Sequence, residues 1–171
     1  MGLASAKLLA SRGAMLSLAD LNEKALKAAI ESLPQSGKHM YRVCNVRDSQ
    51  SVNAWIQDTT SRFGKLDGAV NMAGIISPAV PITRMTDEDW DFNFAVNARG
   101  VFVCIRAQLN AMPNGGSIVS VPISLGSRSK ILCKVSCLEA ESPRSLLLAP
   151  SDRWALRGLL DTVRVKPPSS D

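Results

Sequence analysis

A single tyrosine and a single histidine, Tyr41 and His39, occur in the 171 residues, and aromatic residues make up only 5% of the chain. No segment approaches the roughly 20 consecutive apolar residues that cross a bilayer. The first residues lack the charged region, apolar core and cleavage site of a signal peptide. We therefore expect no membrane segment and a cytoplasmic location.

Patterns typical of metal and nucleic-acid binding are also missing. The cysteines at 44, 104, 133 and 137 form no CxxC pair, and His39 has no second histidine to pair with, so we expect no metal site. The formal charge of +5 is modest and its Lys and Arg residues are scattered singly. Without a basic cluster interleaved with aromatics, nucleic acid is not an expected partner.

What the chain does have is 46% apolar residues arranged in alternating helical and strand patterns. We expect helices over Leu3–Leu9, from a cap at Asn22 to Leu33, from a cap at Asp48 or Ser49 to Phe63 and from about Glu88 to Met112. We expect strands over Ala14–Ala19, His39–Val46, Leu66–Asn71 and Ser117–Val121. Local signals support the ends of these helices: a glycine follows two of them, at Gly13 and Gly64, and Thr86 with Asp89 resembles a capping box. This order predicts an α/β fold, a mainly parallel sheet covered on both faces.

The character changes after Val121. Residues 122–171 contain nine serines and five prolines, no Tyr and no Phe. We therefore divide the chain into a domain at 1–121 and a poorly specified tail at 122–171, in which a helix over Lys130–Glu141 or Trp154–Val165 is the alternative.

Polar residues stand where three of the expected strands end. In a parallel α/β sheet, ligands bind at the carboxyl ends of the strands. Asp20 ends its strand 18 residues after Gly2, near the interval of about 20 residues at which a carboxylate meets the ribose of a dinucleotide. Such a carboxylate favours NAD, because it accepts hydrogen bonds from both ribose hydroxyls and repels a 2′-phosphate. An Asp before a helix is also a common cap, so both roles stay open.

The segment Asn71-Met72-Ala73-Gly74 follows the third strand. Its small residues let the backbone approach a flat ligand, and its Asn can brace neighbouring strands. After Leu66-Asp67-Gly68-Ala69-Val70 it resembles the NNAG motif of the short-chain dehydrogenase/reductase family. Further segments are similar to that family in the same order over residues 1 to about 121: Gly2-Leu3-Ala4 to the end of its glycine-rich turn, Asn45-Val46 to its Asp-Val pair, Asn97-Ala98-Arg99-Gly100-Val101-Phe102 to NVxGxF, and Gly116-Ser117-Ile118-Val119-Ser120-Val121 to GSIVNV.

The resemblance implies a Rossmann-like doubly wound sheet and an NAD(P)-dependent oxidoreductase that interconverts an alcohol and a ketone on a small molecule. It implies NAD(H), favoured by Asp20, with NADP(H) as the alternative, and a homo-oligomer packed through the helix around 88–112. The implied cofactor-binding residues are Gly2, Leu3, Asp20, Leu21, Asn45, Val46, Asn71, Ala73 and Gly74. The implied catalytic residues are Asn97, which in the family helps hold a proton-relay water, and Ser124.

Two departures from the family bear on activity. The family has a strand and its first glycines before the position of Met1, so we expect the central strand to be missing and its neighbours to keep open edges. The family's catalytic serine falls on Ile123, with Ser124 one place late, and no Tyr-x-x-x-Lys follows. Without that tyrosine no proton relay from a phenol can be drawn.

Two hypotheses about function follow. The first is a short-chain oxidoreductase that is impaired or inactive as written, and the second is a non-catalytic remnant or interaction module of a degenerate or mis-spliced gene. A shifted reading frame or retained intron after about residue 121 would explain the abrupt end of the resemblance. An uninterrupted transcript that encodes this tail, with no splice alternative, would refute that explanation.

Overall fold

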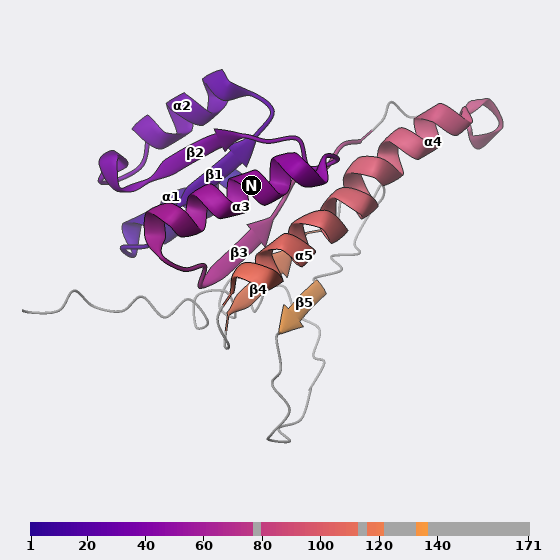
Figure 1. Ribbon diagram of the computed structural model, residues 1–171. Helices are drawn as coiled ribbons and strands as arrows, with labels where there is room; N and C mark the ends of the chain where they lie inside the picture. Colours follow the sequence, from indigo (N-terminus) through magenta and orange to yellow (C-terminus); the bar gives the residue numbers. More distant parts are fainter. Residues whose placement is uncertain (77–79, 113–115, 122–132, 137–171) are drawn as a thin grey trace, which may run out of the picture.

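The computed structural model describes residues 1–76, 80–112 and 116–121, and the backbone of 133–136 (Figure 1). Its elements are α1 (Gly2–Ser11), β1 (Ser17–Asp20), α2 (Glu23–Glu31), the 3₁₀ turn η1 (Ser36–Lys38), β2 (Met40–Val43), α3 (Ser49–Phe63), β3 (Gly68–Asn71), the 3₁₀ turn η2 (Ile82–Arg84), α4 (Asp87–Phe94), the π-helix η3 (Ala95–Gly100), α5 (Val101–Ala111), β4 (Ser117–Ser120) and β5 (Cys133–Ser136). The alternation of strands and helices confirms the predicted α/β class. None of the helices in the described ranges is both long and apolar enough to cross a membrane.

The strands form two sheets. β1 pairs in parallel with β2, and β3 pairs in parallel with β4. Within the described residues β1 and β3 each have one strand partner, β2 and β4 respectively. All four positions of β4 are buried, whereas three of the four in β1 and in β3 are only half-buried.

The helix considered over Lys130–Glu141 is wrong for the part that the structure describes. Residues Cys133–Ser136 form β5, which pairs antiparallel with β4. β3 occupies one edge of β4, and the other edge offers unpaired backbone groups that an extended segment can satisfy. The helix considered over Trp154–Val165 lies outside the described residues.

The local capping signals are confirmed. The Asn22 side chain accepts a hydrogen bond from Ala25 N at 3.0 Å, and Asp48 accepts one from Gln50 N at 2.9 Å. Thr86 and Asp89 form the capping box of α4. Gly13 adopts a left-handed φ of 88° after α1, which an L side chain disfavours.

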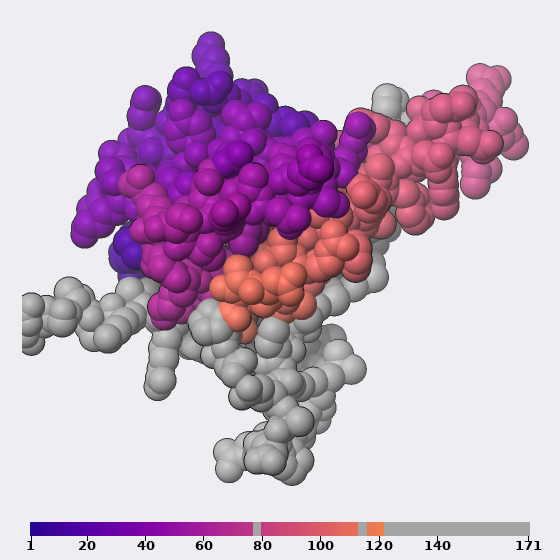
Figure 2. Space-filling model, in the orientation of Figure 1, coloured from indigo at the N-terminus to yellow at the C-terminus, as the bar shows by residue number. Residues whose placement is uncertain are grey.

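The long helix expected from about Glu88 to Met112 is confirmed as one unbroken helical run, in which α4, η3 and α5 follow one another and only the winding changes. Six residues, Ala95–Gly100, adopt the wider π-helical turn. All three segments nevertheless run on in one direction, and α4 projects from the body of the molecule in pink (Figures 1 and 2).

Helices α3 and α5 lie side by side and enclose the main core (Figure 1). Its buried members come from the end of β2, from α3 and from α5: Cys44, Val52, Ile56, Val103, Cys104 and Ala107. Ala6, Ala10 and Leu33 form a second cluster. His39 is buried with both ring nitrogens occupied, by Leu16 N at 3.1 Å and Pro34 O at 2.9 Å, so it is a structural residue.

A buried amide pair ties α5 to the sheet. Asn71 Nδ2 donates to Gln108 Oε1 at 2.9 Å, and Gln108 Nε2 donates to Asn71 Oδ1 at 2.7 Å. Asn71 Nδ2 also contacts Ser120 Oγ on β4 at 3.2 Å. The pair therefore joins β3, β4 and α5 through groups that water cannot reach.

Replacing Gln108 with Leu is expected to lower the free energy of unfolding by about 1–3 kcal/mol, because the buried Asn71 amide loses its partner. Urea unfolding measures the change. The matched control is Gln57→Leu on the exposed face of α3, which should change stability by about 0.5 kcal/mol or less. Equal losses in the two variants would contradict the role of the amide pair.

The buried thiols predict a loss of stability at alkaline pH. Burial raises the pKa of Cys104 to about 12, and the adjacent Cys44 adds to the rise. In the unfolded chain the thiol has its ordinary pKa of 9.0, so the unfolded state loses the proton first. Its contribution to stability is complete below about pH 9 and falls as pH rises toward 12. Urea unfolding at about pH 8 and pH 10.5 should show a steeper loss for the parent than for Cys104→Ala, and equal slopes would sink this account.

Candidate functional site

The carboxyl ends of β1 and β2 lie next to each other. The register pairs Asp20 with Val43, and Cys44 N donates to Asp20 O at 2.9 Å. In the second sheet, Val121 N donates to Asn71 O at 2.9 Å where β3 and β4 end. The polar residues that the sequence places at strand ends therefore stand at strand ends in the structure.

Asp20 is exposed and has one carboxylate oxygen in use. Its Oδ1 accepts from Asn22 N at 2.9 Å, which fixes the turn into α2. The second oxygen has no hydrogen-bond partner among the described residues, and it is available to a ligand. The N-cap of α2 is Asn22 and not Asp20, so the Asp20 carboxylate braces the turn before the helix. Leu21, which follows, is 69% exposed.

Asn45 and Val46 follow β2. Asn45 Oδ1 accepts a hydrogen bond from Arg47 N at 3.1 Å, and Asn45 N donates one to Ser51 Oγ at 3.2 Å. The Asn45 Nδ2 group has no partner in the described part of the chain. The family that the sequence resembles has an Asp at this position, whose carboxylate accepts hydrogen bonds. The Asn45 amide of this chain can also donate them.

The start of α1 lies against the turn after β3. A Cβ on Gly2 would lie 3.8 Å from Met72 Sδ, so the helix start is close to the Asn71-Met72-Ala73-Gly74 segment. α1 has no side-chain N-cap, and uncapped N–H groups at a helix start favour an anion. Leu3 is 46% exposed beside them. Ala73 is also exposed, whereas the Asn71 side chain is buried in its pair with Gln108 and acts on the site only by holding this turn.

Asn97 lies in η3, and both polar atoms of its side chain are in use. Its Oδ1 accepts from Ile75 N at 2.9 Å, and its Nδ2 donates to Ile75 O at 2.9 Å. The side chain therefore holds the backbone that follows Gly74. Ser124, the other candidate catalytic residue, lies outside the described residues. Tyr41 lies inside β2, opposite Leu18, and not at a strand end.

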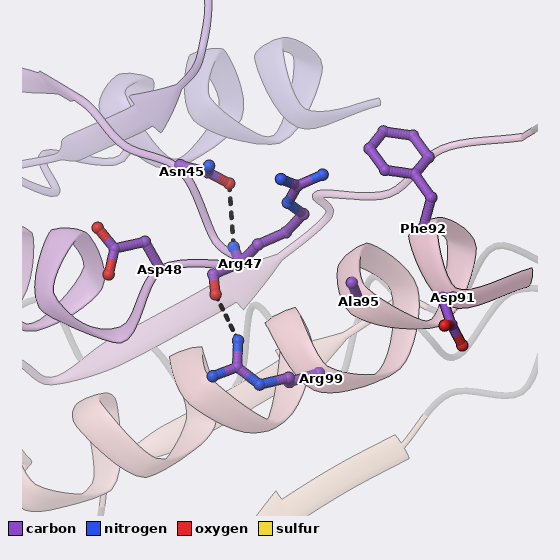
Figure 3. Close-up of a pocket in the computed structure, with 7 residues that line it drawn as sticks. All are labelled: Asn45, Arg47, Asp48, Asp91, Phe92, Ala95 and Arg99. Carbon is purple, nitrogen blue, oxygen red and sulfur yellow. Dashed lines mark hydrogen bonds between the residues drawn. The ribbon is translucent and has the colours of Figure 1, made fainter. Parts of the chain in front are cut away.

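A hollow of about 420 Å³ opens beside Asn45 (Figure 3). Its lining comes from the loop after β2, from α4 and from η3: Asn45, Arg47, Asp48, Asp91, Phe92, Ala95 and Arg99. The Arg47 guanidinium lies 5.1 Å from the centre of the Phe92 ring, and Arg99 Nη1 donates to Arg47 O. Sequence reasoning missed Arg47, Arg99 and Phe92 as neighbours, and only the position of Arg47 two residues after Asn45 offered a signal.

The described residues contain no group of three or more His, Cys, Asp or Glu side chains that could hold a metal ion. The polar groups at the strand ends are a carboxylate, amides and backbone N–H groups. Such groups suit hydroxyls, ring nitrogens and phosphates.

Comparison with known proteins agrees with this arrangement. A family model described as enoyl-(acyl carrier protein) reductase matches residues 1–131. The chain is 43% identical over 125 residues to short-chain dehydrogenase/reductase ABA4 of Pyricularia oryzae, covering 70% of this chain and 46% of that protein. It is 36% identical over 120 residues to levodione reductase of Leifsonia aquatica, covering 68% and 45%.

Solved structures share the fold as well. A short-chain dehydrogenase/reductase from Brucella melitensis, titled glucose/ribitol dehydrogenase, is 30% identical with a TM-score of 0.65, over 70% of this chain and 52% of that one. The chain spans about half the length of the curated relatives it matches. The family model matches most of the residues, and the relatives and solved structures share the Rossmann-type α/β fold. The chain therefore belongs to the short-chain dehydrogenase/reductase family.

Proposed function

We propose that this chain binds NAD(H) at the ends of β1, β2 and β3 as the dinucleotide-binding part of an oxidoreductase that interconverts an alcohol and a ketone. The observation that carries the proposal is the exposed Asp20 carboxylate, with one oxygen free of described partners, beside the loop that begins at Asn45. The uncapped start of α1 against Met72 supports it.

Each residue would have a distinct task toward the cofactor. Asp20 would accept hydrogen bonds from the adenosine ribose, and its charge would disfavour the 2′-phosphate of NADP(H). The Asn45 amide would donate to the adenine, with Val46, Leu21 and Leu3 as apolar neighbours. Gly2, Ala73 and Gly74 would leave room for the cofactor to approach the backbone. The bound nicotinamide would supply hydride transfer.

Turnover requires a group that exchanges a proton with the substrate. The side chain of Asn97 is committed to Ile75, and the one tyrosine lies within β2. We therefore propose that the 171 residues alone bind cofactor without reducing a carbonyl at enzymatic speed. The substrate class is a small alcohol or ketone, as the name of the related levodione reductase suggests. A cytoplasmic location remains part of the proposal.

A second candidate is a remnant that binds no cofactor, and the half-buried open edges of β1 and β3 favour it. Titration with NADH separates the two candidates through nicotinamide fluorescence and thermal stabilisation. Binding without ketone-dependent oxidation of NADH supports the first. Absence of binding supports the remnant, and rapid oxidation would show that another residue replaces the tyrosine.

Asp20→Asn tests the role of the carboxylate, because the amide oxygen can still accept from Asn22 N while the charge is lost. We expect Kd for NADH to rise about tenfold, as hydrogen bonds to a charged group are lost, and the preference for NADH over NADPH to shrink. Asp67→Asn, an exposed residue just before β3, is the matched control. Unchanged preference in Asp20→Asn would rule out this assignment.

We also propose that two copies of the chain pair through α4 and α5. Trp90, Phe92, Phe94 and Phe102 are each 47–58% exposed, which excludes them from the core of this chain. Trp90 and Phe94 stack with ring centres 4.3 Å apart, and Phe102 lines an apolar groove on α5 with Val101, Ile105 and Leu109. Apolar patches of this kind are typical of interaction surfaces.

Light scattering coupled to size exclusion should give the parent the mass of a dimer. Phe102→Glu should give the mass of a monomer, because it places a charge in the groove. Met15→Glu, which changes a residue that is also exposed but lies before β1, should leave the dimer intact. A monomeric parent would contradict the pairing.

A further inference from the structure

The π-helix η3 contacts two loops that belong to different sheets. One loop follows β2, in the sheet of β1 and β2, and the other follows β3, in the sheet of β3, β4 and β5. β1 and β3 share no ladder in the described residues. A single six-residue turn therefore connects the carboxyl ends of two sheets that backbone pairing does not join.

Toward the loop after β2, η3 makes a close approach and a hydrogen bond. A Cβ on Gly100 would lie 2.9 Å from Val46 Cγ2 and 3.3 Å from Val46 Cβ, so only glycine lets the turn come this close. One residue earlier, Arg99 donates to the carbonyl of Arg47 (Figure 3). Arg47 in turn lies over Phe92 of α4.

Toward the loop after β3, η3 makes a paired contact. The Asn97 side chain donates to Ile75 O and accepts from Ile75 N, both at 2.9 Å. This arrangement copies the two hydrogen bonds of a strand pair, and it fixes the backbone just after Gly74. Asn97 therefore contacts the loop after β3, and Gly100 lies against Val46 in the loop after β2.

We infer that η3 sets the separation of these two loops, with Asn97, Arg99 and Gly100 as its positioning residues. The inference deepens the proposed function and rests on it in one respect, that the cofactor lies between the loops. None of the three residues needs to touch the cofactor through its side chain. Their contacts hold Val46 and Arg47 in one loop and Ile75, just after Gly74, in the other.

Hydrogen exchange of the chain without cofactor tests the bridge directly. In Asn97→Ala, amides at 72–76 should exchange about tenfold faster, because two hydrogen bonds to Ile75 are lost. The decisive measurement is made on the loop after β2. Its amides at 44–48 should also exchange at least about threefold faster, since η3 holds this loop as well as the loop after β3. A purely local role would accelerate only the loop that the altered residue contacts, and that outcome would overturn the inference.

Arg99→Ala is the milder reciprocal variant, because Arg99 is exposed and its change removes one hydrogen bond to Arg47. It should accelerate exchange at 44–48 and, more weakly, at 72–76. Arg106→Ala, which changes an exposed arginine on α5 that lies over Phe102, is the control and should affect neither loop. Unchanged exchange at 117–120 in β4 verifies that each variant is folded.

Steric relief gives a second test. Gly100→Ala should lower the urea midpoint, because its Cβ meets Val46, even though alanine favours helix over glycine. In a Val46→Ala background the same substitution loses its closest contact, at 2.9 Å, and keeps only the one to Cβ at 3.3 Å, so it should lower the midpoint less. The same loss of stability in both backgrounds would contradict the close approach as the cause.

Titration with NADH then separates the inference from the proposed function. If the parent binds, Arg99→Ala should raise Kd about threefold or more while Arg106→Ala does not, and equal affinities would count against the bridge. If the parent does not bind NADH, the proposed function fails, and the exchange and stability results still decide whether η3 couples the two loops.

Discussion

The packing of α3 against α5 holds this molecule together, because the described strands of the two sheets are not joined by a ladder. Val52 and Ile56 of α3 meet Val103 and Cys104 of α5 in a core that shields them from water. Burial of such side chains contributes about 1.5–3 kcal/mol each. Helix packing thus does here what continuous strand pairing does in an unbroken sheet.

Side chains at the strand ends are shared between local structure and a prospective ligand. Asp20 uses one oxygen for Asn22, and Asn45 uses its oxygen for Arg47. Each keeps a polar group that faces no described partner. Asn97 differs, because Ile75 occupies both of its polar atoms. The ends of β1 and β2 therefore keep more polar groups without described partners than the Asn97 side chain does.

The features that could be predicted from the sequence are those decided within a few residues. The cap at Asn22 and the capping box at Thr86 depend on neighbours three positions away, and both are present. The π-helix η3 was not predictable, because it is supported by contacts with Val46 and Ile75, far away in the chain. The strand β5 was missed for the same reason, since its partner β4 determines its extended form.

The same distinction between local and long-range contacts separates the site residues that could be predicted from those that could not. Motif order placed Asp20, Asn45 and the turn after Asn71 at strand ends, where the structure has them. Arg47, Arg99 and Phe92 were missed, because no spacing rule brings a loop, a π-helix and α4 together. The functional roles of all these candidate residues, Ser124 included, stay predictions.

The continuous run of α4, η3 and α5 has a mechanical consequence. The α5 end is anchored in the core by Val103 and Cys104, whereas α4 has no buried residue at all. Within the described residues α4 is therefore held by its junction with η3 and by contacts at its surface, such as that of Phe92 with Arg47. By simple geometry, any tilt of α4 about that junction displaces Trp90 farther than Asn97, because Trp90 lies farther from the anchored end.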